Sequence, residues 1–524
     1  MTTQTMISVQ IQEIVDWLRA NVADAVKTQL TSDSREIGQG DVFFAFPITS
    51  GIAGKGDGRA FIHNAIERGA AAIVYEKTDV SAAMEISVPH LAVSGLIDLL
   101  GAIASAWYGE PDKEMFSVAV TGTNGKTSCS QWIAKALSLQ NTPCAVIGTL
   151  GVGTYRDGMV ASLQETGFTT PDALQLQRRL AALKKNGAKG LAIEASSIGL
   201  HQGRLNALHF DVALFTNLTR DHLDYHLTME AYAAAKQALF QWPGLQAAVI
   251  NADDTFGTEL LQRLSVTQPA LKLLAYCIDG ESELRGSTSG VAILRASQLK
   301  TTHTGTQFYL ESPYGSGLVK TQTIGRFNIS NVLGVLGVLL MRGITWERAI
   351  ASIEKLTSVP GRMQQLGSAG QAMVVVDYAH TPDALEKTLE TLQQVALERQ
   401  GNLWCVFGCG GDRDPGKRPQ MGKIAQMAQH VVVTSDNPRT EAPAKIIQDI
   451  LQGMSGAPHA IEDRASAILF AVKHAQVNDV ILIAGKGHET YQDINGKKWP
   501  FSDEEHALLA LATVATNSTM RRTT

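Results

Sequence analysis

Short apolar runs alternate with segments of helical periodicity through most of the chain. The runs at 116–120, 191–193, 212–215 and 247–250 lie between polar or glycine-bearing segments and helical patterns. Parallel strands that are covered on both faces are almost continuously apolar, because crossover helices pack on both sides of their sheet. The pattern therefore predicts a doubly wound, mostly parallel α/β sheet in the middle of the chain.

The same alternation begins again near residue 357. Apolar runs at 373–376, 403–407, 431–433 and 480–484 are again separated by helical segments. These runs end at polar, glycine-bearing loops, and open α/β sheets bind their ligands at that edge. We therefore expect a second, Rossmann-like α/β domain at the C-terminal end.

The residues before about 112 form a third region, with an apolar strand at 42–46, a helix at 60–69 and a polar linker at 109–113. A chain of 524 residues is long enough for about three domains of ~100–200 residues each. The pattern predicts three α/β domains: a small N-terminal domain at 1–112, a central P-loop-type domain at 113–356 and a C-terminal domain at 357–524.

The composition narrows the class of protein. Of the residues, 44% are hydrophobic and 18% charged, and the net charge is -5, so we expect no nucleic-acid partner. Five cysteines without a paired spacing favour a reducing cytoplasm. The N-terminus lacks signal-peptide features and no apolar run approaches ~18 residues, so secretion and membrane insertion are not expected. A monomer is the default expectation.

The strongest local motif is Thr121-Gly-Thr-Asn-Gly-Lys-Thr127, between a predicted strand and a predicted helix. Its glycines are closer together than in the common P-loop, but the chemistry is the same, since exposed backbone N–H groups bind phosphates and a lysine neutralises their charge. A GTPase or a kinase would use a similar loop, and a glycine-rich turn with a surface lysine is the alternative. We assign ATP binding to Gly122, Thr123, Asn124, Gly125, Lys126, Thr127 and Ser128.

Four further motifs follow this loop in order: Thr169-Thr-Pro171, Glu194-Ala-Ser-Ser197, the segment 216–224 (TNLTRDHLD) and Gly485-Lys-Gly-His-Glu489. With these motifs the chain resembles the Mur ligases over nearly its whole length, and among them the members that add the third residue of the peptidoglycan stem peptide. The resemblance implies a ligase that phosphorylates a substrate carboxylate with ATP, after which an amine attacks the acyl phosphate. Both reacting groups are anionic, so cations must bring them together.

The resemblance also implies where those cations lie. Lys126 would act on the phosphates, Thr127 and Glu194 would hold a first Mg²⁺, and His222 would help to hold a second. Lys236 stands where the family carries a carbamylated lysine (N6-carboxylysine), which would make it an anionic metal ligand. Taken without the resemblance, Lys236 is an ordinary solvated helix lysine. The expected catalytic residues are Lys126, His222 and Lys236.

Three residues outside the loop are expected to complete the ATP site by resemblance. They are Asn331, the best candidate for an adenine ligand, together with Arg362 and Asp377. The last two lie beyond the central domain, so the resemblance implies that ATP bridges two domains.

The acceptor, UDP-N-acetylmuramoyl-L-alanyl-D-glutamate, is expected to contact Ser34 with its UDP end. Ser34 could also be a plain turn residue. By resemblance, five further residues match the positions with which the family binds this acceptor, namely Thr169, Thr170, Ser196, Gln202 and Arg204. The chain departs from the family pattern at Phe168 and Ile198, where apolar residues replace hydrogen-bonding ones.

The selectivity for the amino acid is expected in Ser435-Asp-Asn-Pro-Arg-Thr440. This sequence resembles the members that add meso-2,6-diaminopimelate, because a guanidinium binds the distal carboxylate of that amino acid and repels the ammonium of L-lysine. A surface arginine after a proline turn is the alternative for Arg439. The expected binding residues are Arg413, Asp436, Asn437, Pro438, Arg439, Gly485 and Glu489.

Three other functions remain open from the sequence alone. An L-lysine-adding ligase would lack the charge of Arg439, and a folylpolyglutamate synthetase-like ligase fits the first region and the Asp436-to-Arg439 loop poorly. A nucleotide-binding module without catalysis would not need Lys126, Glu194, His222 and Lys236 together.

Overall fold

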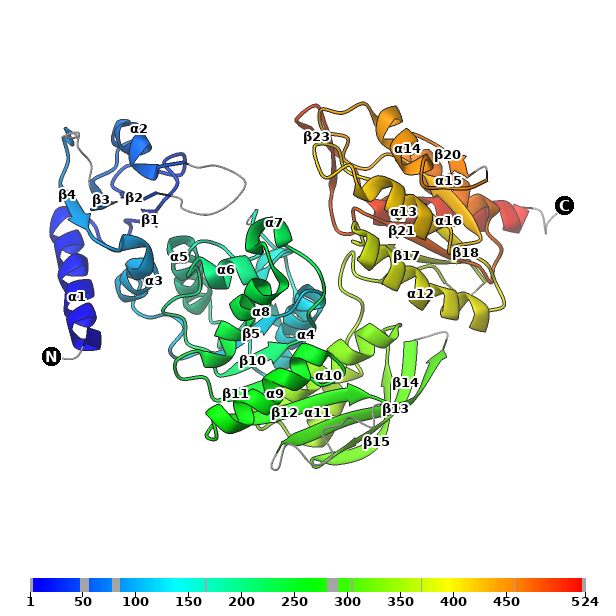
Figure 1. Ribbon diagram of the computed structural model, residues 1–524, viewed down its shortest axis with the longest axis horizontal. Helices are drawn as coiled ribbons and strands as arrows, with labels where there is room; N and C mark the ends of the chain where they lie inside the picture. Colours follow the sequence, from blue (N-terminus) through cyan, green and yellow to red (C-terminus); the bar gives the residue numbers. More distant parts are fainter. Residues whose placement is uncertain are drawn as a thin grey trace. The chain divides into compact units, whose positions relative to one another are not determined.

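The computed structural model describes residues 3–47, 56–77, 85–164, 167–279, 291–302, 305–368, 370–456 and 458–520. The chain divides into two compact units (Figure 1). The first comprises residues 1–298, 309–319 and 330–354, and the second comprises 299–308, 320–329 and 355–524. No helix in the described ranges is both long enough and apolar enough to cross a membrane.

The first unit begins with a four-stranded parallel sheet in the order β1-β2-β3-β4. Helices α1 and α3 pack on one face of this sheet, and α2 packs on the other. The elements are α1 (Thr3–Asn21), β1 (Leu30–Thr31), β2 (Val42–Ala45), the 3-10 helix η1 (Gly58–Phe61), α2 (Ile62–Glu67), β3 (Ala72–Glu76), β4 (His90–Val93) and α3 (Leu96–Trp107).

An eleven-stranded sheet follows, in the order β15-β14-β13-β12-β11-β10-β5-β9-β6-β7-β8. Its centre is parallel, while β7 and β8 pair antiparallel at one edge. The strands are β5 (Phe116–Thr121), β6 (Cys144–Gly148), β7 (Gly151–Arg156), β8 (Met159–Val160), β9 (Gly190–Glu194), β10 (Val212–Phe215), β11 (Ala247–Asn251), β12 (Lys272–Ile278), β13 (Ala292–Thr302), β14 (Gly305–Ser312) and β15 (Gly315–Thr321).

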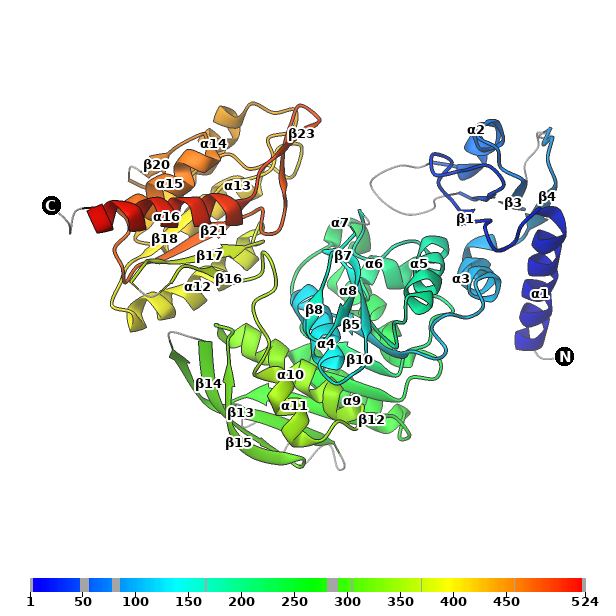
Figure 2. The same cartoon turned by 180° about the vertical axis from the view of Figure 1, so that it is seen from behind.

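Helices cover both faces of this sheet, as its apolar strands require. Leucines of α5 and α9 and Leu200 of α6 share one core with β5, β9, β10 and β11 (Figure 1), while α4 and α10 lie on the other face (Figure 2). The helices are α4 (Lys126–Ser138), α5 (Ala173–Lys185), α6 (Ser197–His201), α7 (Leu223–His226), α8 (Met229–Gln237), η2 (Ala238–Gln241), α9 (Thr255–Thr267), α10 (Arg326–Met341) and α11 (Trp346–Ile353).

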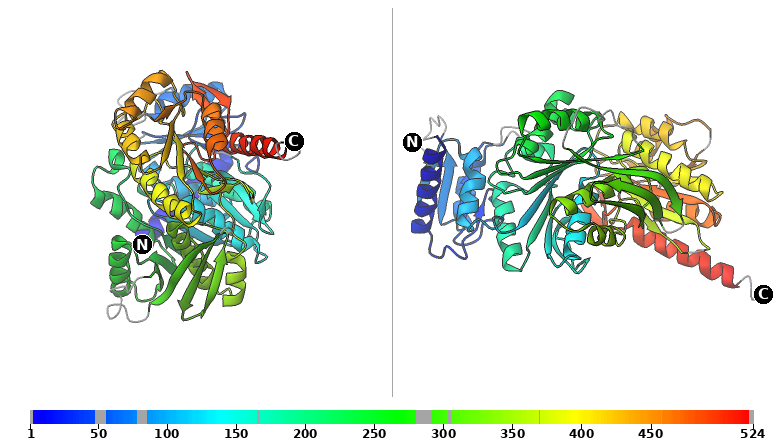
Figure 3. Two further views of the ribbon diagram at one scale, coloured as in Figure 1. Left: turned by 90° about the vertical axis from the view of Figure 1, so that its right-hand side faces the viewer. Right: turned by 90° about the horizontal axis from the view of Figure 1, so that it is seen from below.

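The second unit contains a six-stranded sheet in the order β16-β17-β21-β18-β19-β20, parallel except at β16. Helices α12 to α14 cover one face and α15 and α16 the other, and α16 extends past the sheet (Figure 3). The elements are β16 (Gln364–Leu366), β17 (Met373–Asp377), α12 (Pro382–Glu398), β18 (Leu403–Phe407), α13 (Lys417–Ala425), β19 (His430–Val433), α14 (Pro443–Leu451), β20 (His459–Ala460), α15 (Arg464–His474), β21 (Val480–Ala484), β22 (Tyr491–Ile494), β23 (Lys497–Pro500) and α16 (Asp503–Met520).

The predicted fold class is confirmed, with parallel-rich sheets that helices cover on both faces. Every apolar run used in the prediction coincides with a strand, although β2 ends at Ala45, one residue before the end of the predicted run, and the loop at 121–127 joins β5 to α4 as expected. The pattern did not reveal β6, β7, β8 or β12 to β15; of these, β7 and β8 are only partly buried, so their sequences are not continuous apolar runs.

Candidate active site

Lys126 makes hydrogen bonds across the loop that follows β5. Lys126 begins α4, and its Nζ donates hydrogen bonds to the carbonyl oxygens of Gly122 at 2.9 Å and Thr123 at 2.8 Å. Backbone N–H groups at the start of a helix have no intrahelical partner, so they attract phosphate oxygens. The backbone N–H groups of Thr123 and Asn124 are bonded to Asn217, so the first turn of α4, together with the Lys126 ammonium, is the part of the loop that suits a phosphate.

Gly125 brings the loop against a residue from a distant part of the sequence. Its φ is +85°, which an L side chain rarely adopts, and a Cβ at this position would meet the side-chain oxygen of Asn331. Asn331 is buried in α10, and its backbone carbonyl lies 3.8 Å from the Sγ of Cys129. The structure thus brings Asn331 against the phosphate loop.

Glu194, at the end of β9, is a fully buried carboxylate beside the loop. It accepts hydrogen bonds from the Oγ1 of Thr127 at 3.1 Å and from the backbone N and Oγ1 of Thr149 at 2.8 and 3.1 Å. A side chain at Gly148 would collide with this carboxylate. A buried carboxylate must be hydrogen-bonded or paired with a cation, so these oxygens suit a hard divalent ion.

Lys236 of α8 is also buried, with 1% of its surface exposed. Its Nζ donates to the carbonyl oxygen of Gly122 at 2.7 Å and lies 4.3 Å from the centre of the Tyr232 ring. Burial, reinforced by the charge of Lys126, holds the pKa of Lys236 well below its usual range. Lys236 is therefore a buried amine that favours its neutral form, and it is not the solvated lysine of the alternative interpretation.

His222 precedes α7 with a left-handed backbone (φ 52°). Its Nε2 lies 3.4 Å from the Oδ2 of Asp221, and its ring lies edge-on to Tyr232, with 6.1 Å between the centroids. Burial lowers the pKa of His222, and the charges of Lys126 and Lys236 act in the same direction. A neutral imidazole is the form that can bind a metal.

The described residues contain no group of three or more histidine, cysteine, aspartate or glutamate side chains that could hold a metal ion. A metal at this loop would therefore need ligands of several kinds, namely the hydroxyl of Thr127, the carboxylate of Glu194 and oxygens of the bound phosphates.

The residues expected to bind the acceptor form a connected group beside Glu194. The Oγ1 of Thr169 lies 3.1 Å from that of Thr149, and the Oγ1 of Thr170 donates to the backbone oxygen of Glu194 at 2.7 Å. Ser196 lies 3.0 Å from Thr170 and caps the start of α6. The structure thus links Thr170 directly to Glu194, and it links Thr169 and Ser196 to Glu194 through Thr149 and Thr170.

Arg204 extends this group. Its NH1 donates to the carbonyl oxygen of Thr170 at 2.8 Å, and its Nε and NH2 donate to the Oε1 of Gln202 at 2.9 and 2.6 Å. The guanidinium lies 5.4 Å from the centre of the exposed Phe168 ring. Phe168 therefore contacts the predicted anion-binding arginine, while Ile198 is half-buried in α6. Ser34 lies, buried, in the turn after β1.

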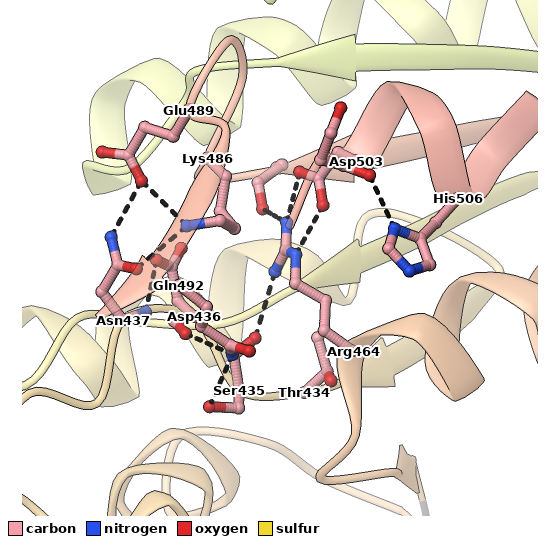
Figure 4. Close-up of polar contacts among 12 residues, drawn as sticks. Thr434, Ser435, Asp436, Asn437, Arg464, Lys486, Glu489, Gln492, Asp503 and His506 are labelled. Atoms are coloured by element: carbon pink, nitrogen blue, oxygen red, sulfur yellow. Dashed lines mark hydrogen bonds and ion pairs between the residues drawn. The ribbon is translucent and has the colours of Figure 1, made fainter. Parts of the chain in front are cut away.

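In the second unit, the segment from Ser435 to Thr440 follows β19, and Figure 4 shows its polar contacts. Asn437 lies at the centre of these contacts. Its Nδ2 donates to the Oε2 of Glu489 at 2.8 Å, and its Oδ1 accepts from the Nζ of Lys486 at 3.0 Å and from the backbone N of Asp493 at 2.9 Å. The Nζ of Lys486 also donates to the Oε2 of Glu489 at 2.9 Å.

A fully buried ion pair contacts the start of the segment from Ser435 to Thr440. Arg464 and Asp503 have no exposed surface, and two hydrogen bonds of 2.7 and 2.8 Å join them (Figure 4). Arg464 also donates to the backbone oxygens of Ser435 at 3.3 Å and Ala484 at 2.9 Å. One arginine therefore contacts the segment after β19 and the end of β21, two strands of the sheet that are separated by β18.

Arg439 is half-buried, with a left-handed backbone (φ 51°). Its NH1 donates to the carbonyl oxygen of Gly411 at 2.7 Å. Within the described ranges its Nε and NH2 make no hydrogen bond, so this edge of the guanidinium can receive a carboxylate. Arg413 is exposed, and Gly485 approaches the carboxylate of Asp436 so closely that a Cβ would contact it. Pro438 is buried between Asn437 and Arg439.

The two remaining predicted ATP residues also belong to the second unit. Asp377 ends β17 and accepts hydrogen bonds from the backbone N of Met363 at 2.8 Å and of Ala379 at 2.9 Å. Burial raises the pKa of Asp377, although these hydrogen bonds oppose the shift. Arg362 lies over the ring of Tyr378 at 4.5 Å, and its buried Nε makes no hydrogen bond within the described part of the chain.

Sequence reasoning did not select Thr149 or Lys486, although each contacts two predicted site residues. The position of Thr149 immediately after a β-strand was an available signal, because open sheets bind ligands at the carboxyl ends of strands. Lys486 lies within the quoted segment 485–489, but the sequence does not reveal that its side chain is buried.

Two family models match the chain. The Mur ligase middle domain covers residues 120–339, and the Mur ligase, glutamate ligase domain covers residues 361–487. Three similar proteins carry the name UDP-N-acetylmuramoyl-L-alanyl-D-glutamate--2,6-diaminopimelate ligase. The one from Janthinobacterium sp. (strain Marseille) is 56% identical over 96% of this chain and 97% of its own length. Those from Ralstonia nicotianae and Pseudomonas aeruginosa are 51% and 46% identical, over 98% and 93% of this chain and 98% and 96% of their own lengths.

Solved structures agree with these matches. A structure with the same ligase name is 38% identical and has a TM-score of 0.65, with 93% of this chain and 94% of that chain covered. Folylpolyglutamate synthase from Mycobacterium tuberculosis, at 17% identity and a TM-score of 0.56 over 74% of this chain and 92% of that one, shares the fold alone. The order of the motifs, the grouping of their side chains and these matches lead to one conclusion: the chain belongs to the Mur ligase family.

Proposed function

We propose that this chain is an ATP-dependent ligase that joins meso-2,6-diaminopimelate to UDP-N-acetylmuramoyl-L-alanyl-D-glutamate in peptidoglycan synthesis. The observation that carries the proposal is the 56% identity, over 96% of the chain, to a ligase named for these two substrates. The reaction is an acid–amino-acid ligation, with ADP and phosphate as products.

The phosphate loop would perform the first step. The first turn of α4 would hold the phosphates of ATP with its backbone N–H groups, and Lys126 would exchange the loop carbonyls for the transferred group and neutralise its charge. The acceptor carboxylate attacks the γ-phosphorus, and ADP departs. This step is needed because a carboxylate is a poor acyl electrophile, whereas phosphate is a competent leaving group.

Magnesium, when bound, would supply positive charge between the phosphates and the acceptor carboxylate. The Oγ1 of Thr127 and the carboxylate of Glu194 suit such an ion, since both are buried oxygen ligands that already lie 3.1 Å apart. We infer that His222 helps to hold a second ion. The burial of Lys236 supports its carbamylation, because the neutral amine is the form that reacts with CO₂.

The acceptor would lie along Thr169, Thr170, Ser196, Gln202 and Arg204. These side chains already form one hydrogen-bonded group that reaches Glu194. An acceptor bound along this group would have its carboxylate near the phosphate loop. We keep Ser34 as a contact for the UDP end.

The amino acid would bind in the second unit, between Arg439 and the pair of Asn437 and Glu489. The free edge of the Arg439 guanidinium suits the distal carboxylate of diaminopimelate and repels the ammonium of L-lysine. The backbone around Arg439 depends on Asp436 and Pro438 of the same segment and on Gly485, which lies against the Asp436 carboxylate. Arg413 would supply a further positive charge.

The nucleotide is expected to be held also by Asn331, Arg362 and Asp377. We retain the domain boundaries near residues 112 and 356. The five cysteines are free and buried, and free thiols are typical of a reducing compartment, so we propose a cytoplasmic reaction.

Phosphate release tests the proposal. The purified chain is supplied with ATP, Mg²⁺ and UDP-N-acetylmuramoyl-L-alanyl-D-glutamate, and meso-diaminopimelate is compared with L-lysine and with no amino acid. Release and tripeptide formation with diaminopimelate alone would support the proposed reaction. A preference for L-lysine would support a ligase but contradict the role of Arg439. If neither amino acid stimulated phosphate release, the proposed function would be wrong.

A further inference from the structure

Lys486 is a fully buried lysine inside the proposed amino-acid site. It has no exposed surface, whereas 19% of the Glu489 side chain is exposed. Its Nζ donates to Asn437 and Glu489, two residues assigned to the amino acid, and lies 5.7 Å from the centre of the Tyr491 ring. A group without exposed surface does not touch a ligand that enters from solvent. Lys486 can therefore act only through its neighbours.

The contacts of Lys486 determine how the amide of Asn437 is turned. Two donors, the Nζ of Lys486 and the backbone N of Asp493, face the same atom of this amide (Figure 4). That atom must be the oxygen, because an amide nitrogen accepts no hydrogen bond. The Nδ2 consequently faces the Oε2 of Glu489 at 2.8 Å.

This orientation leaves a donor beside an acceptor. One N–H of the Asn437 amide and the Oε1 of Glu489 have no partner among the described residues. A donor and an anionic oxygen side by side complement the carboxylate and the ammonium of one amino-acid centre. If the Asn437 amide were reversed, its oxygen would face both the Oε2 of Glu489 and the carboxylate of the ligand. The amide oxygen would then repel each of these two anionic groups.

We propose that Lys486 is a positioning residue for the amino-acid substrate. Its Nζ holds the amide of Asn437 in the binding orientation and fixes one oxygen of Glu489, so that the other oxygen receives the ammonium of the substrate. The inference rests on the proposed function and adds a residue to the amino-acid site.

Steady-state kinetics of the full-length ligase test this role. Lys486→Met removes both hydrogen bonds, so we expect the KM for diaminopimelate to rise about 10- to 100-fold, which corresponds to ~1.4–2.7 kcal/mol. The KM values for ATP and the acceptor should stay within about twofold of those of the wild type, since the binding of these two substrates does not depend on the Asn437 amide. Lys486→Gln keeps a donor for Asn437 without the charge, so its KM for diaminopimelate should lie between those of the wild type and Lys486→Met.

Lys497→Met is the matched control, because Lys497 is exposed in the neighbouring hairpin and lies over Trp499. Its kinetics should equal those of the wild type. An unchanged KM for diaminopimelate in Lys486→Met, or an equal rise for all three substrates, would overturn the inference alone. A Lys486→Gln protein that does not fold would also overturn it, since the fold would then require the lysine. An inactive wild type would reject the proposed function and this inference together.

Discussion

Two buried lysines show how the partners of a residue decide what it can do. Lys236 donates to a backbone carbonyl, lies over an aromatic ring and has a strongly lowered pKa, so it favours a neutral amine. Lys486 instead pairs with the carboxylate of Glu489 at 2.9 Å. The first lysine suits a covalent modification, while the second suits the orientation of other side chains.

Arg439 offers the sharpest prediction for a single residue. Arg439→Ala removes the free edge of the guanidinium, so the KM for diaminopimelate should rise about 10- to 100-fold, as expected for the loss of a bidentate carboxylate pair. Arg439→Lys keeps the positive charge but not the planar guanidinium. Its KM for diaminopimelate should therefore lie between those of the wild type and Arg439→Ala. The measurement is tripeptide formation at varied diaminopimelate and L-lysine. Unchanged selectivity in Arg439→Ala would contradict the assignment of this residue.

At the scale of elements, helix α13 holds together two of the three loops that carry the proposed amino-acid ligands, namely those after β18 and β19. Arg418 of α13 is buried and donates to the Oε1 of Glu441 at 2.7 Å, to the Oδ2 of Asp449 at 2.9 Å and to the carbonyl oxygen of Gly410 at 3.3 Å. Glu441 in turn accepts from the backbone N of Asp412 at 2.7 Å. The loop after β18 and the loop after β19 are thus fixed to each other.

This network predicts a pH-dependent contribution to stability. The hydrogen bonds of Arg418 lower the pKa of Glu441 from 4.5 to about 2. Because the pKa in the folded state lies below the ordinary value, the pair stabilises the fold above about pH 4.5 and loses this effect as the pH falls toward about 2. Glu441→Gln should therefore cost ~1–2 kcal/mol at about pH 7, after allowance for solvent screening, and much less at about pH 3.

Urea unfolding of the wild type and Glu441→Gln at both pH values provides the measurement. Glu398→Gln is a suitable control, since Glu398 is the exposed last residue of α12. A difference between wild type and Glu441→Gln that stays constant with pH would show that the carboxylate charge of Glu441 does not carry the stabilisation.

At the scale of the whole molecule, the residues expected to bind ATP belong to both compact units. The phosphate loop and Asn331 lie in the first unit, and Arg362 and Asp377 lie in the second. Arg362→Ala should raise the KM for ATP about tenfold and leave the KM for diaminopimelate nearly unchanged, because only the nucleotide contact is lost. Kinetics at varied ATP check this result. An unchanged KM for ATP would mean that the first unit binds the nucleotide alone.

Much of this protein could be predicted from its sequence, because strong local patterns coincide with its elements. The strands β5, β9, β10, β11, β17, β18, β19 and β21 are continuous apolar runs, and such runs are required where helices cover both faces of a sheet. The phosphate loop was equally clear, since glycines and a lysine between a strand and a helix are needed for phosphate binding. Resemblance then supplied Glu194, Lys236 and Arg439.

Only the tertiary structure decided which of these side chains meet. Thr149 binds Glu194 because β6 and β9 are neighbours in the sheet, although they lie far apart along the chain. Lys486 is buried because the segments after β19 and β21 close around it. Local patterns determine strands, helices and phosphate loops, because these depend on neighbouring residues. The burial and partners of a charged side chain depend on residues from distant segments, so they follow only from the folded chain.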